Sequence, residues 1–112
     1  MVNELRIGPL KLATNLLLAP MAGFCDMPYR LVVRSCGGVG LASTALLSPQ
    51  GILRANEQSL RLAATSAADS PLAYQIYGSD PEWLCEAARW SADRGADAID
   101  LNMGCPVPQV TR

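Results

Sequence analysis

The residue most able to do chemistry is Cys105, in the segment AIDLNMGCPVP at positions 98–108. An apolar run ends there at Asn102, and the cysteine then stands between Gly104 and Pro106, two residues that stop regular structure. The pattern predicts a thiol on a loop directly beyond a strand. By residue type alone a cysteine is most often a small buried hydrophobic group, so its role depends on its neighbours.

Metal chemistry has little support in this sequence. The four cysteines form no CxxC pair, and the 112 residues contain no histidine. Zinc sites are built from such pairs and from histidine, so the sequence predicts no metal site. We expect free thiols, with small buried side chains at Cys25, Cys36 and Cys85.

Turn-forming or polar residues also interrupt or follow other apolar runs. Pro20, Met21 and Ala22 follow the run at 16–19, and Gln75 lies inside the run at 72–77. The turn residues could serve only to end a strand. A buried amide needs hydrogen-bond partners, so Gln75 and Asn102 bond either to protein groups or to a ligand.

Apolar runs and amphipathic stretches alternate along the chain. Strands are predicted at 16–19, 39–47, 72–77 and 97–102, and helices at 27–36, at 52–64 and between the GSDP segment at 78–81 and Gly95. Asp26 is expected to cap the first helix, and Ser79 or Asp80 the third. Near the N-terminus, Gly8 and Pro9 predict the turn of a short hairpin that could cover the bottom of a barrel.

This order of elements predicts an α/β fold. Strands of mostly apolar residues between helices indicate a parallel sheet covered on both faces, or a barrel. Chemistry in a (β/α)8 barrel lies where its strands end, which is where the unusual residues occur here. Four βα units are half of such a barrel, which needs about 250 residues. The chain is therefore expected to be the N-terminal half of a (β/α)8 TIM barrel, truncated, or an open sheet.

Composition narrows the function classes. Half of the residues are apolar, and nine basic against ten acidic residues give a net charge of −1. The segment therefore has no overall attraction to a polyanion, and a basic RNA-binding surface would lie elsewhere. No apolar run approaches the roughly 20 residues of a membrane span, and no signal-peptide pattern is present. The sequence predicts a cytoplasmic protein.

Three motifs, LAPMAGFCDMPYR, QIYGSDPEWL and IDLNMGCPVPQV, closely resemble the tRNA-dihydrouridine synthases from about Ile7 to the last residue. That family consists of flavoenzymes with an FMN-binding barrel. The resemblance implies that NADPH reduces FMN, that the flavin passes a hydride to C6 of a tRNA uridine, and that a cysteine protonates C5. By match to the motif, this cysteine is Cys105.

The same resemblance implies roles for the other candidates. In the family, the turn matching Pro20, Met21 and Ala22 lays its backbone along the isoalloxazine ring. The resemblance also implies that Gln75 meets the flavin ring and that Asn102 meets the edge of the uridine or of the flavin. These residues are therefore expected to bind cofactor and substrate.

The chain departs from the family at several points. It has Ala45 where the family often carries an acidic residue, and Gln109 where it often carries a lysine. It ends at Arg112, before the lysine, histidine and phosphate-binding glycines that hold FMN and before the helical RNA-binding domain. Residues 1–112 are therefore expected to form a partial catalytic domain that is inactive alone.

Two alternatives stay open. A different FMN barrel, such as a dihydroorotate dehydrogenase or an enoate reductase, would share the scaffold and reduce a small molecule. A non-catalytic remnant or RNA-associated module is the other. The cysteine of the NMGCP motif favours a synthase over a different FMN barrel.

Overall fold

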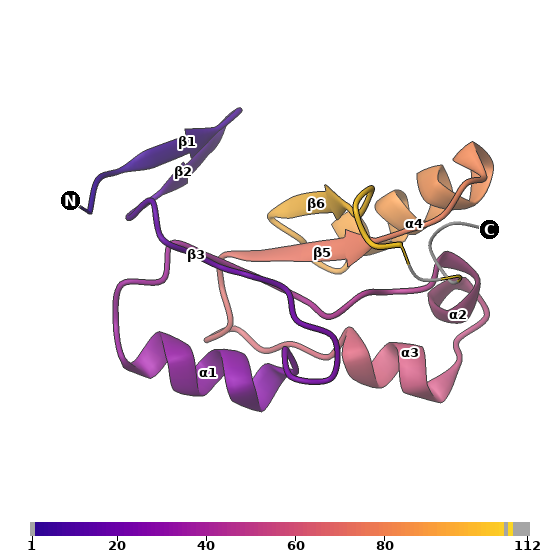
Figure 1. The fold of residues 1–112 in the computed structure, drawn as a ribbon, viewed down its shortest axis with the longest axis horizontal. Helices are drawn as coiled ribbons and strands as arrows, with labels where there is room; N and C mark the ends of the chain where they lie inside the picture. The colour runs from indigo at the N-terminus through magenta and orange to yellow at the C-terminus, as the bar shows by residue number, and fades with distance from the viewer. Residues whose placement is uncertain (1, 107, 109–112) are drawn as a thin grey trace.

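A parallel sheet of four strands forms the centre of the computed structural model, which describes residues 2–106 and 108 (Figure 1). The strands are β3 (Leu17–Leu18), β4 (Leu41–Ser43), β5 (Leu72–Ile76) and β6 (Ala98–Leu101). They lie side by side in the order of the sequence. The predicted α/β class is confirmed, and this topology is compatible with part of a TIM barrel.

A short hairpin precedes the sheet. Strand β1 (Leu5–Ile7) pairs antiparallel with β2 (Leu10–Leu12), and Gly8 adopts a φ of +57° at the turn between them. Leu12 is fully buried and packs against Leu41 and Ala73 near the amino-terminal ends of β4 and β5. The hairpin predicted at Gly8 is confirmed, and it covers the end of the sheet opposite the candidate residues.

The first and last helices begin where their caps predict. Helix α1 (Met27–Ser35) starts after Asp26, whose carboxylate accepts a hydrogen bond from the Tyr29 amide at 3.0 Å. Helix α4 (Pro81–Asp93) starts after Asp80, which accepts from the Glu82 amide at 2.9 Å. Each cap satisfies an amide that has no partner within its helix.

The helix predicted at 52–64 is wrong as a single element. The segment contains the end of α2 (Pro49–Leu53) and all of α3 (Glu57–Leu62). Ala55 between them has a φ of +55°, and the Asn56 side chain caps α3 through the Ser59 amide. A left-handed residue cannot continue a helix, and an asparagine competes for backbone amides, so the chain restarts there.

The two faces of the sheet differ. All five residues of β5 are buried, and Leu72, Tyr74 and Ile76 pack with residues of α2 and α4. Side chains alternate across a strand, so Ala73 and Gln75 point to the other face. The helices thus cover one face, and Gln75 lies on the face that would become the interior of a barrel.

Candidate active site

The carboxyl ends of the strands bring the candidate residues to one edge of the sheet. A cavity of about 390 Å³ lies against the face opposite the helices, and Pro20, Ser43 and Asp100 line it. The rest of its lining is mainly aliphatic side chains of the strands: Ile7, Leu17, Leu18, Leu41, Ala73, Ala98 and Ile99. An apolar hollow with a few polar groups has the composition of a small-molecule site.

A chain of side-chain hydrogen bonds crosses this edge. Gln75 is only 7% exposed, and its Nε2 donates to Asp100 Oδ2 at 2.7 Å. Its Oε1 accepts from Asn102 Nδ2 at 3.4 Å. Gln75 and Asp100 are register partners on β5 and β6, so the sheet itself brings them together. The sequence analysis did not single out Asp100, although a carboxylate inside an otherwise apolar strand indicates a polar group that needs a partner.

The loop that carries Cys105 is closed by Asn102. Its Oδ1 accepts from the amides of Gly104 at 3.2 Å and Cys105 at 3.0 Å. The backbone N–H of Asn102 donates to the carbonyl of Ile76 at 3.0 Å, which continues the backbone hydrogen bonds between β5 and β6. The structure therefore brings Gln75, Asn102 and Cys105 together, with the half-buried thiol on a turn fixed to the sheet.

The turn at Pro20, Met21 and Ala22 is held from behind by Cys25. The Met21 amide donates to Cys25 Sγ at 3.2 Å, and this thiol donates to the Ala19 carbonyl at 3.2 Å. Cys25 is fully buried, as expected, yet it fixes the loop through hydrogen bonds as well as packing. The expectation of burial is wrong for the two other thiols, because Cys36 and Cys85 are exposed.

Beneath this turn lies a buried ion cluster. The Asp69 carboxylate is completely buried and pairs with Arg30 at 2.8 Å and Arg34 at 3.0 Å. Burial raises the pKa of Asp69, but the hydrogen bond and charge of Arg30, helped by Arg34 and Thr65, outweigh burial and hold the pKa below its usual range. Arg30 also donates to the Cys25 carbonyl at 2.6 Å, which joins the cluster to the turn.

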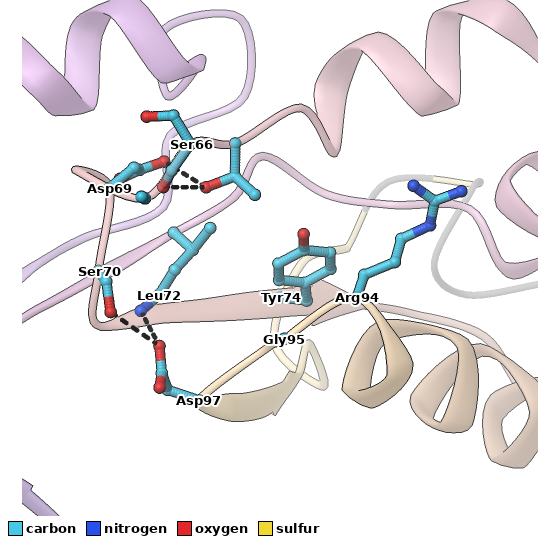
Figure 2. Close-up of a pocket in the computed structure, with 10 residues that line it drawn as sticks. Ser66, Asp69, Ser70, Leu72, Tyr74, Arg94, Gly95 and Asp97 are labelled. Atoms are coloured by element: carbon cyan, nitrogen blue, oxygen red, sulfur yellow. Dashed lines mark hydrogen bonds between the residues drawn. The ribbon is translucent and has the colours of Figure 1, made fainter.

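A second cavity lies at the opposite end of the strands (Figure 2). Its volume is about 430 Å³, and its lining comes from the segments that enter β5 and β6 and from Leu72 and Tyr74 of β5. The Asp97 carboxylate accepts from the Leu72 amide at 2.8 Å and from Ser70 Oγ at 3.5 Å, and Thr65 bonds to Asp69 at 3.1 Å. These bonds join segments of the scaffold, and no predicted site residue lines this cavity.

Within residues 2–106 and 108, no group of three or more histidine, cysteine, aspartate or glutamate residues could hold a metal ion. In the same part of the chain, no helix is long and apolar enough to cross a membrane. Of the two departures from the family pattern, Ala45 is buried at 4% exposure and Gln109 lies outside the described residues.

Comparison with known proteins identifies related chains. The sequence model of the family "Dihydrouridine synthase (Dus)" matches residues 17–112. The tRNA-dihydrouridine synthase B of Pseudomonas aeruginosa is 41% identical over 109 residues, which are 97% of this chain and 32% of that protein. The tRNA-dihydrouridine synthase B of Xanthomonas axonopodis pv. citri is 39% identical over 95% of this chain and 32% of its own length. The chain thus spans about a third of the length of these curated relatives.

Proposed function

This chain belongs to the dihydrouridine synthase family, and we propose that it supplies the first part of an FMN-binding barrel that reduces uridine in tRNA to 5,6-dihydrouridine. The observation that carries the proposal is the position of Cys105. The family's cysteine motif ends on a turn that Asn102 fixes to the carboxyl end of a parallel sheet. That end is where barrel enzymes hold their reacting groups.

The residues at this edge fit a flavin. Pro20, at this edge, lines the 390 Å³ cavity, whose aliphatic wall extends along the strands to the hairpin residue Ile7. Gln75 offers a second amide hydrogen for a ring heteroatom, since only one is used by Asp100. We assign the backbone of Pro20, Met21 and Ala22 and the Gln75 amide to FMN. Held by these residues, FMN would supply the hydride-transfer chemistry between NADPH and C6 of uridine.

The chain's own chemical step is a proton transfer. In the proposed reaction, the Cys105 thiol gives its proton to C5 of the uracil ring, on the face opposite the hydride. A base inside a folded tRNA must leave its stack to reach such a site. The remaining hydrogen of Asn102 Nδ2 can then meet a uracil oxygen, because Gln75 accepts only one of the two.

The test uses a completed enzyme, in which residues 1–112 replace the matching segment of the Pseudomonas aeruginosa relative. We expect it to purify with FMN and to form dihydrouridine in tRNA whose uridines have not been reduced beforehand. Cys105→Ala should slow dihydrouridine formation by about 10²- to 10⁴-fold, the usual contribution of a positioned general acid. Reduction of the flavin by NADPH should be unchanged, because that half-reaction needs no proton for uridine.

The matched control is Cys36→Ala, which removes an exposed thiol far along the sequence from the motif. It should leave both half-reactions at the parent rates. If Cys105→Ala forms dihydrouridine as fast as the parent, the acid is another group and the assignment is overturned. A thermal unfolding transition and bound flavin identify any variant that has failed to fold.

A further inference from the structure

The side chain of Asn102 has two ends with different uses. Its oxygen accepts from two consecutive loop amides, Gly104 and Cys105, while its nitrogen faces Gln75. An asparagine that only bound a ligand would need neither loop contact. The oxygen is therefore committed to the loop, and the position of the thiol depends on the position of this one carboxamide.

Gln75, in the middle of the hydrogen-bond chain, is firmly anchored by its backbone. The backbone N–H of Gln75 donates to Thr44 Oγ1 at 3.0 Å, and the backbone carbonyl of Gln75 accepts from the Leu47 amide at 2.9 Å. Gln75 is thus bonded on its backbone to the β4 side and on its side chain to Asp100 on β6. Thr44 is itself fully buried. Gln75 is therefore a fixed point from which the loop can be held.

We propose that Asn102 is a positioning residue for the Cys105 thiol, held by a chain that runs from Asp100 through Gln75. Asp100 accepts from the Gln75 side-chain amide and fixes it, and Gln75 in turn orients the Asn102 side chain. The Asn102 Oδ1 then holds the backbone N–H groups of Gly104 and Cys105. This deepens the proposed function and rests on it where it concerns catalysis. A general acid must be held near its proton acceptor, and small displacements of such a group are costly in rate.

The first experiment measures the loop in this chain without any ligand. Hydrogen exchange of the Gly104 and Cys105 amides is compared in the parent, Asn102→Ala and Asn102→Asp. Losing one hydrogen bond of about 1 kcal/mol should speed exchange about fivefold at each amide in Asn102→Ala. Asn102→Asp keeps an acceptor oxygen and should retain the protection.

The control is Asn56→Ala, because Asn56 makes the same kind of bond, from its Oδ1 to the Ser59 amide, at the start of α3. It should alter exchange at Ser59 and leave the loop unchanged. Amides of β5 serve as internal references for global unfolding. Unchanged exchange at Gly104 and Cys105 in Asn102→Ala would overturn the positioning role.

The second experiment uses the completed enzyme and separates the oxygen from the nitrogen. Positioning by the oxygen predicts that Asn102→Ala lowers kcat for dihydrouridine formation while KM for tRNA stays near the parent value. It also predicts that Asn102→Asp, which keeps the oxygen but loses the nitrogen that faces Gln75, loses less kcat than Asn102→Ala, whereas flavin reduction by NADPH is the same in all three proteins. Equal loss of kcat in both variants, or a rise in KM alone, would contradict it.

The two proposals fail differently. If Cys105→Ala forms dihydrouridine at the parent rate, the assignment of Cys105 as the acid is refuted, but the hydrogen-exchange result at the loop is unaffected. Unchanged loop exchange in Asn102→Ala removes the positioning role and leaves the Cys105 result standing.

Discussion

Two hydrogen-bonded clusters of this protein invite comparison. One is the ion cluster of Arg30, Arg34 and Asp69, and the other is the amide chain of Asp100, Gln75 and Asn102. In the ion cluster, Arg30 and Asp69 are completely buried. In the amide chain, Gln75 is buried, and Asp100 and Asn102 are partly exposed. The charges of the first cluster are paired with one another, whereas the amides of the second have more hydrogens than the bonds made among the described residues.

The partners of each cluster show the same contrast. Arg30 donates to Asp69, to the Cys25 carbonyl and to the Ala64 carbonyl, so its groups are used inside the protein. The amide chain ends on the backbone of a loop, and among the described residues each of its two side-chain amides donates only one hydrogen. Buried charges that are fully paired stabilise one arrangement of the chain. Neutral amides at a partly open edge can hold a loop and still bind a ligand.

The largest effect on this contrast is expected from Asp69→Asn. The change keeps the shape of the side chain but leaves Arg30 buried without its opposite charge, which costs about 3–5 kcal/mol of unfolding free energy in comparable pairs. Urea unfolding of the 112-residue chain measures it. Glu57→Gln is the control, because its pair with Arg61 is exposed and should matter little. Equal midpoints for the two variants would show that the cluster is not a stabilising element.

Acid should weaken the ion cluster by a smaller amount. The pKa of Asp69 in the folded protein lies below its unfolded value of about 3.9, so its contribution is complete above that pH and is lost as pH falls through the folded pKa. Unfolding free energies at pH 6, 4.5 and 3 should therefore converge between the parent and Asp69→Asn. A constant difference across this range would contradict the assigned titration, since the other carboxylates are common to both proteins.

The smallest effect is expected from Gln75→Leu in the completed enzyme. The change removes hydrogen bonds of about 1 kcal/mol and keeps the volume, so FMN should bind about fivefold more weakly while the fold remains. Fluorescence titration with FMN gives the affinity, and thermal unfolding checks the fold. Unfolding with unchanged affinity per folded molecule would show that Gln75 belongs with the ion cluster as a purely structural group.

Local patterns in the sequence predicted much of the fold. The caps at Asp26 and Asp80, the hairpin turn at Gly8 and the four apolar strands each depend on a few neighbouring residues, and the structure contains them, although the strand predicted at 39–47 is only β4 at Leu41–Ser43. The division between α2 and α3 was missed because Ala55 carries no signal of a left-handed conformation. Exposure of Cys36 and Cys85 was missed because the residue type alone does not say whether a position in a helix or at its end faces solvent.

The sequence by itself determined the alternation of strands and helices, the family motif and the position of Cys105 between a glycine and a proline. These are encoded within short stretches, where backbone preference and spacing act directly. Only the tertiary structure decided that Gln75 and Asp100 anchor the side chain of Asn102 and that the Arg30–Asp69 pair anchors the turn that follows Pro20. Gln75 and Asp100 are 25 residues apart, and Arg30 and Asp69 are 39 apart. Such pairs depend on strand register and on the docking of a helix against a loop, which no local pattern specifies.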